Sequence, residues 1–159
     1  MKKKTTQIIR MTVVALAFLM SSCGDNQNST NMKNVMKLDE CKLELNIPSG
    51  WKLDSQSMCS KGDATGIFDF ESLNGRTFDG AVEQISTEFG SKIISKDKMQ
   101  VAEKKAVKVY IDAENDVKLL RVYVDCGDKI AYISYAVPKN LFASYEPDLL
   151  KSIDSIKQK

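Results

Sequence analysis

The sequence predicts an α+β domain in which a central antiparallel β-sheet is flanked by helices on both faces. Three observations support this prediction. Several segments alternate apolar and polar residues with the period of two that is typical of strands, and two other segments repeat apolar residues at helical spacing. The later strands follow one another across short turns, so consecutive strands should pair antiparallel.

The first strand is expected from residue 38 onward, where apolar residues alternate with polar ones. Pro48, Ser49 and Gly50 end it, and Trp51 and Leu53 then begin a return strand or extended segment. Residues 66–71 predict a further strand, which ends at an Asn-Gly pair. The alternating apolar positions of the first strand are Cys41, Leu43, Leu45 and Ile47.

A helix is expected next, with Thr77 as its N-cap, Asp79 in its first turn and Gly90 at its end. Its buried stripe consists of Phe78, Ala81, Val82, Ile85 and Phe89.

Extended segments follow the helix, and the last two are joined by Gly127 and Asp128, a pair typical of hairpin turns. The last segment has apolar residues on both faces, as a central strand covered on each side would have. Pro147 is expected at the first position of a closing helix. The segments are residues 93–95, 99–102, 107–113, 117–126 and 129–137, and the stripe of the closing helix is Leu149, Leu150, Ile153 and Ile156.

The N-terminus has the organisation of an export signal. Lys2, Lys3, Lys4 and Arg10 precede an apolar block of about ten residues, 11–20. A membrane-spanning helix needs about 20 apolar residues, so this block predicts a cleaved signal peptide instead.

Ser21, Ser22 and Cys23 follow the block and resemble the lipobox of bacterial lipoproteins, although Met20 stands where the family usually has Leu. The resemblance implies that residues 1–22 are a lipoprotein signal peptide and that Cys23 is lipidated on its thiol and its amine. Two or three acyl chains anchor a protein stably, whereas one binds only marginally. The polar residues after Cys23 lack the apolar surface needed to order themselves, so residues 23–37 are expected to be a flexible tether and residues 38–159 the globular domain.

Charge and composition exclude several classes of function. The full chain carries a net charge of +2, but residues 1–22 contain four bases and no acid, so the remainder carries −2. Such a chain lacks the basic surface that nucleic-acid binding requires. The sequence contains no histidine, which excludes Ser-His-Asp triads, Cys-His pairs and histidine-ligated metals.

The two ends of the expected domain resemble those of PsbP-like domains. Residues 45–51, an apolar strand followed by Pro, Ser, Gly and Trp51, are similar to the opening of that family, and residues 142–156 are similar to its last helix. The resemblance covers roughly residues 38–157. It implies a sandwich with helices on both faces of a central antiparallel sheet, in a family of photosystem subunits, a Ran-binding transport factor, envelope lipoproteins and effector chaperones. These proteins share binding rather than catalysis, so no active site is carried over.

Three cysteines remain in the domain besides Cys23. A hairpin at residues 48–50 would bring Cys41 and Cys59 closest together, so this pair is the first candidate for a disulfide. A Cys59–Cys126 bond and three free thiols are the alternatives. Cys126 could also be a reactive thiol, but it stands between two acids and has no histidine to activate it.

Other polar and aromatic groups have both a functional and a structural interpretation. Asp112, Glu114 and Asp116 could bind Ca²⁺ but lack EF-hand spacing, so a solvated turn is favoured. Asp69 and Glu71 share one strand face at a spacing that acid–base pairs use, but a polar strand face is favoured. The tyrosines of the strand region could form a binding face or belong to the core; these are Tyr110, Tyr123, Tyr132 and Tyr135.

Together these features predict a non-catalytic binding or assembly module, lipid-anchored to a bacterial membrane in the cell envelope. We expect the protein to bind the membrane through its lipid anchor and to bind a protein of the envelope. We expect no nucleic acid, metal or cofactor, and the oligomeric state stays open. The first alternative is a small-ligand carrier with a pocket between sheet and helix. The second is a thiol-dependent enzyme or redox sensor that uses Cys126.

Overall fold

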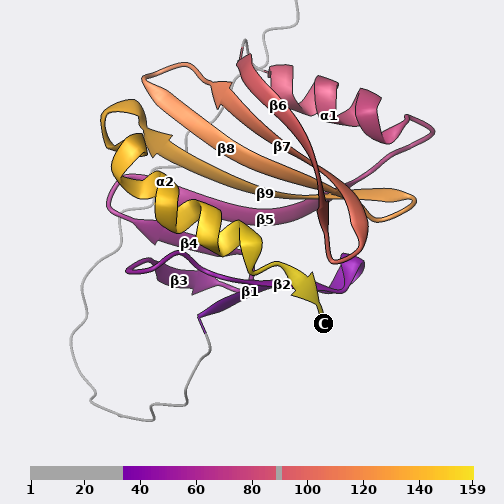
Figure 1. Ribbon diagram of the computed structural model, residues 1–159, viewed down its shortest axis with the longest axis horizontal. Coiled ribbons are helices and arrows are strands. Elements are labelled where there is room, and N and C mark those ends of the chain that lie inside the picture. The colour runs from indigo at the N-terminus through magenta and orange to yellow at the C-terminus, as the bar shows by residue number, and fades with distance from the viewer. Residues whose placement is uncertain (1–33, 89–90) are drawn as a thin grey trace, which may run out of the picture. The chain divides into compact units, whose positions relative to one another are not determined.

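The structure, a computed structural model, describes residues 34–88 and 91–159 (Figure 1). The expected signal peptide, Cys23, Phe89 and Gly90 lie outside these residues. The described elements are β1 (Val35–Leu38), a 3-10 helix η1 (Asp39–Cys41), β2 (Leu43–Asn46), β3 (Lys52–Ser55), β4 (Met58–Lys61), β5 (Ala64–Ser72), α1 (Phe78–Thr87), β6 (Lys92–Val101), β7 (Lys104–Asp112), β8 (Val117–Asp125), β9 (Lys129–Pro138), α2 (Lys139–Asp154) and β10 (Lys157–Gln158).

Seven strands form one antiparallel sheet in the order β3-β4-β5-β9-β8-β7-β6. The chain leaves this sheet after β5, passes through α1 to the far edge, and returns as the meander β6 to β9 until β9 pairs with β5. The predicted hairpin at Gly127 and Asp128 joins β8 to β9, with Cys126 N donating to Lys129 O at 3.0 Å. The two extended stretches expected at 93–95 and 99–102 are one strand, β6, with a bulge between Ile93 and Ser95.

A second sheet forms in the order β1-β2-β10, and three predictions for this part of the chain are wrong. The strand expected from residue 38 onward begins only at Leu43, because η1 spans Asp39–Cys41 and Lys42 adopts a left-handed φ of 53°. No hairpin forms at residues 48–50, since β2 pairs with β1 and β10 while β3 pairs with β4. The expected tether is also too long, because residues 35–37 belong to β1 and Met36 is fully buried.

Alternate side chains of the large sheet enter two separate hydrophobic clusters, as the period of a strand requires. In β8, Leu120, Val122 and Val124 pack in the cluster that contains α2 and the small sheet. Leu119 and Tyr123 pack in the cluster that contains α1. The expected sandwich is therefore confirmed only in part: the chain is mostly β, and a second sheet shares the layer of α2.

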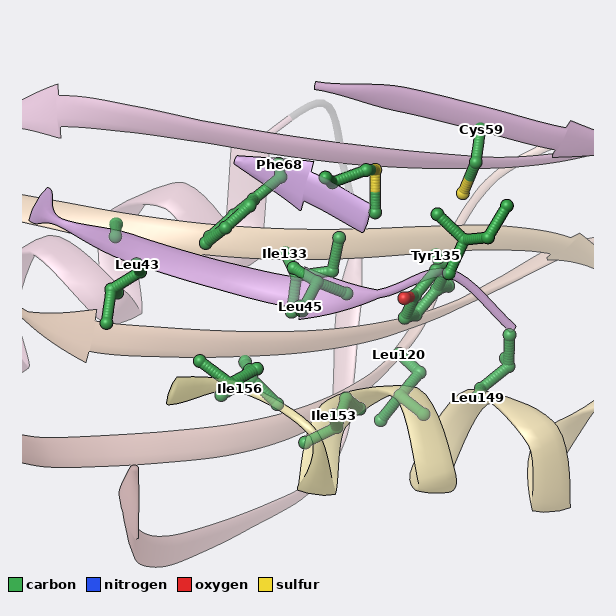
Figure 2. Close-up of a cluster of buried hydrophobic side chains, with 14 of the residues drawn as sticks. Leu43, Leu45, Cys59, Phe68, Leu120, Ile133, Tyr135, Leu149, Ile153 and Ile156 are labelled. Atoms are coloured by element: carbon green, nitrogen blue, oxygen red, sulfur yellow. The ribbon is translucent and has the colours of Figure 1, made fainter. Parts of the chain in front are cut away.

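The layer of α2 and the small sheet is held by apolar contact and by one buried hydrogen-bond network. Figure 2 shows side chains of β2 and α2 directed toward those of the large sheet. The hydroxyls of Tyr135 on β9 and Ser152 on α2 lie 2.5 Å apart, and Ser152 also donates to the backbone oxygen of Asn46 on β2. This network joins α2 and the small sheet to β9 of the large sheet.

Both expected helices form, but the start of the second was predicted wrongly. Thr77 caps α1 as predicted, since its Oγ1 accepts from Gly80 N at 3.1 Å. Pro147 lies inside α2 rather than at its first position. A proline lacks the N–H that would bond to the preceding turn, but here it stands on the exposed side, and the buried Phe142 and Leu149 hold the helix on both sides of it.

Candidate functional site

Arg121 is the centre of the most distinctive polar arrangement between α1 and the large sheet. Strand alternation on β8 places it on the face that α1 covers, between Leu119 and Tyr123. Its Nε donates to Ser134 Oγ of the neighbouring strand at 2.9 Å, and its Nη1 donates to Ile85 O of α1 at 3.1 Å. The guanidinium therefore links two strands and the helix.

The same network continues into the core through hydroxyl groups. Tyr123 is fully buried, and its Oη lies 3.3 Å from Arg121 Nη1 and accepts from Ser86 Oγ of α1 at 3.0 Å. Ser86 is 1% exposed. A buried hydroxyl without a hydrogen-bond partner costs free energy of folding, so each group in this network fixes the position of the next.

A pocket of about 350 Å³ opens beside Arg121, at the C-terminal end of α1 and the turn between β7 and β8. Its lining combines the apolar Ile85, Val117 and Leu119 with the guanidinium and with the carboxylates of Glu88 and Glu114. Within residues 34–88 and 91–159, Arg121 forms no ion pair, and its hydrogen-bond partners are two hydroxyls and a carbonyl. A partly buried cation without a counter-ion is suited to an anionic group.

The three cysteines of the domain are free thiols, and their arrangement differs from the expected one. The Cys41–Cys59 pairing rested on the hairpin at residues 48–50, and that hairpin does not form. Cys59 lies on β4 opposite Gly66 of β5, and Gly66 pairs on its other side with Tyr135 of β9. The thiol beside Cys41 is that of Cys126.

Burial determines the acidity of two of these thiols. Burial, with the neighbouring Cys126 thiol as a second cause, raises the pKa of Cys41 to about 12. Burial also raises the pKa of Cys59 to about 12, with the charge of Asp54 as a second cause. Both side chains are therefore protonated at neutral pH, and neither is an activated nucleophile.

Three of the five acidic candidates have basic partners in the structure. Lys139 Nζ lies 2.6 Å from Asp112 Oδ1 and 3.9 Å from Asp116 Oδ1, and its contact with Asp112 raises the pKa of the lysine. Glu71 pairs with Arg76, which also donates to Ser72 O and Leu73 O. In the part of the chain that the structure describes, no group of three metal-ligating side chains stands together.

The tyrosines are mainly part of the core rather than of a binding face. Tyr123 and Tyr135 are fully buried, and Tyr110 and Tyr132 are partly buried against the two clusters. Trp51 is 5% exposed and packs edge-on against Tyr135, with ring centroids 5.6 Å apart.

The sequence did not lead us to predict a role for Arg121 or the proximity of Cys41 to Cys126. Arg121 carried a usable signal, because a single charge interrupts the otherwise apolar run of residues 119–124. The proximity of Cys41 and Cys126 carried none, since it arises from the packing of one sheet on another. Over residues 34–88 and 91–159, no helix combines the length and apolar character needed to cross a bilayer.

Comparisons with known proteins bear on the fold alone. No family model matches the sequence, and no curated protein matches it. The solution structure of cyanobacterial PsbP (CyanoP) from Synechocystis sp. PCC 6803 matches with a TM-score of 0.59 at 8% identity, over 88% of this chain and 99% of that one. PA94, a protein of unknown function from Pseudomonas aeruginosa, matches with a TM-score of 0.53 at 14% identity, over 76% of this chain and 93% of that one. The domain therefore has a PsbP-like fold.

Proposed function

We propose that this chain, which has a PsbP-like fold, is a lipid-anchored lipoprotein of the bacterial cell envelope and acts as a non-catalytic binding or assembly module. The observation that carries the proposal is the conjunction of a short apolar block with Ser21, Ser22 and Cys23, followed by a domain of this fold. The absence of histidine from the sequence and the protonated state of the buried thiols agree with a non-catalytic role.

The anchor contributes to binding through concentration. A domain held at the membrane by acyl chains on Cys23 meets membrane-bound partners at a high effective concentration, so a modest intrinsic affinity is sufficient. The partners we propose are the membrane itself and a protein of the envelope. The net charge of −2 after residue 22 supports neither DNA nor RNA as a partner.

Two experiments in intact cells test this proposal. Labelling with an alkyne-bearing palmitate should mark the chain, and Cys23→Ser should abolish the label and release the protein from the membrane fraction. Cys126→Ser is the matched control and should keep both properties. A labelled Cys23→Ser variant, or an unlabelled parent chain, would contradict the lipid anchor.

Cross-linking of the lipidated protein in cells then tests the binding role. A single envelope protein captured in stoichiometric amount is the expected result, and its capture should fall in the unanchored Cys23→Ser variant. Reproducible capture of nothing by a folded and lipidated chain would argue against an assembly module.

The pocket beside Arg121 favours a second candidate function, that of a small-ligand carrier. A ligand with an anionic group could pair with the guanidinium, and hydrogen-bond donors on the same ligand could face Glu88 and Glu114. Native mass spectrometry of protein purified from the envelope should then reveal a bound small molecule. Arg121→Gln should lose it while Arg76→Gln, which changes the domain's other arginine outside the pocket lining, retains it; equal retention by both variants would rule out this site.

A further inference from the structure

The 3-10 helix η1 and the β8–β9 turn lie toward the same end of the large sheet (Figure 1). Cys41 is the last residue of η1, and Cys126 directly follows β8. The two lysines whose charges act on Cys41 are Lys104 and Lys129, the first residues of β7 and β9. Cys41 therefore lies among the turns at this end.

Cys41 and Cys126 belong to the same hydrophobic cluster, and the Cys126 thiol is the neighbouring thiol that acts on Cys41. Cys41 is 6% exposed, whereas Cys126 is only partly buried. Cys59 is 1% exposed and pairs across the strands with Gly66, and it is not among the groups that act on Cys41. One pair of thiols is thus adjacent, and one member of that pair is open to a reagent.

Backbone hydrogen bonds hold both partners of the pair in place. The residue after Cys41, Lys42, donates its N–H to Asp39 O at 3.1 Å and accepts from Lys159 N at 2.9 Å. Lys159 also pairs with the Asp39 carboxylate at 2.8 Å. On the other side, Cys126 N donates to Lys129 O at 3.0 Å and Gly127 N donates to Asp125 Oδ1 at 3.0 Å.

We propose that Cys41 and Cys126 are a specific oxidation site, which closes to an intramolecular disulfide when the folded protein meets a disulfide oxidant, while Cys59 stays a thiol. The bond would tie η1 and the small sheet to the β8–β9 hairpin of the large sheet. The two cysteines are neighbours in one cluster, and the hydrogen bonds described above hold the backbone on both sides of the bond.

The reaction balances as two thiol–disulfide exchanges. The thiolate of the more accessible Cys126 attacks one sulfur of the oxidant, forms a mixed disulfide and expels the first thiolate. Cys41 then gives up its proton to water and attacks the Cys126 sulfur, which expels the second thiolate. One oxidant disulfide is reduced to two thiols, and the protein loses two protons and two electrons.

Oxidised glutathione is the probe for this site. The full chain is reduced, freed of reductant, incubated with the probe, blocked with N-ethylmaleimide and digested without reduction for mass spectrometry. We expect one cross-linked peptide pair that contains Cys41 and Cys126, and Cys59 recovered as a thiol that the blocking reagent reaches only after unfolding. The Cys59→Ser variant is the matched control and should oxidise like the parent chain.

Several outcomes would overturn the proposal. These are a Cys41–Cys59 or Cys59–Cys126 cross-link, glutathione retained on Cys126 with Cys41 still reduced, and a folded chain that does not oxidise at all. Because the parent chain and Cys59→Ser carry the test, it does not depend on whether Cys41→Ser or Cys126→Ser folds. Where these two variants do fold, each should take up glutathione or nothing, and neither should form an intramolecular bond.

Discussion

Gly66 illustrates a single-residue requirement set by two neighbouring strands. It lies between Cys59 of β4 and Tyr135 of β9, which are its direct cross-strand partners. A Cβ at this position would stand 2.7 Å from Cys59 Sγ and 2.7 Å from a ring carbon of Tyr135. No real Cβ contact is this short, so one of the neighbours must move.

Gly66→Ala should therefore destabilise the domain by about 1–3 kcal/mol, the usual cost of overpacking a core. Urea denaturation followed by circular dichroism measures this difference. Thr65→Ala, at the exposed position next to it, is the control and should change stability by less than about 0.5 kcal/mol. Equal effects of the two substitutions would show that the close contacts do not constrain residue 66.

The buried hydroxyl of Tyr123 is expected to matter through its partners. Tyr123→Phe removes the acceptor of Ser86 Oγ and a neighbour of Arg121, so it should cost about 1–3 kcal/mol. Ser86→Ala should cost a similar amount, and the double variant should cost clearly less than the sum, because the two hydroxyls satisfy one another. Additive losses in equilibrium unfolding would contradict a shared hydrogen bond.

The raised thiol pKa values predict a loss of stability in alkaline solution. Cys41 and Cys59 have pKa values of about 12 in the folded chain against a usual value of 9.0, so the unfolded chain releases these protons first. The stability that depends on the neutral thiols is complete below about pH 9 and is lost as the pH rises toward 12. Denaturation under reductant from about pH 8 to pH 11 should show this decline, and Cys59→Ala should show a shallower one.

At the scale of elements, the start of α1 depends on Thr77. Its hydroxyl satisfies the N–H of Gly80, one of the groups that a helix leaves without an internal partner. Thr77→Ala should cost about 1 kcal/mol, whereas Thr77→Ser keeps the acceptor oxygen and should cost only a few tenths of that value. Thermal unfolding of both variants checks this, and equal losses would contradict the cap.

The prediction of elements succeeded where a local signal was strong and failed where packing decided. The β8–β9 hairpin carries its own turn residues, and α1 carries its own cap and stripe. Pro147 misled the prediction of α2, because a proline normally begins a helix, while here the buried residues on both sides keep it within one. Local rules do not include the free energy of burying Phe142 and Leu149 together.

At the scale of the whole molecule, β1 makes the small sheet part of the domain core. Met36 is fully buried in the cluster that also contains α2, and Lys37 next to it is exposed. Met36→Ala should therefore cost about 2–5 kcal/mol, the usual cost of truncating a large buried side chain. Lys37→Ala is the control and should be nearly neutral in the same denaturation experiment. A neutral Met36→Ala would indicate that residues 35–37 belong to the tether rather than to the core.

Much of the overall architecture follows from the order of amphipathic segments. The meander of β6 to β9, the crossing through α1 and the closing helix are each indicated by periodicity and turn residues. The small sheet is not, because its strands are short and lie far apart in the chain, with β10 at one end and β1 and β2 at the other. Short strands carry little periodicity, so their pairing depends on which edges the rest of the fold leaves free.

The sequence by itself determined the antiparallel character of the large sheet, the two helices and the resemblance to PsbP-like domains, because these depend on local spacing and on turn residues. Only the tertiary structure decided that Cys41 neighbours Cys126 rather than Cys59, that Arg121 stands beside a pocket, and that residues 35–37 belong to the core. Each of these features depends on contacts between elements distant in the chain. Such contacts are selected by the free energy of burying whole layers, which no local pattern of residues records.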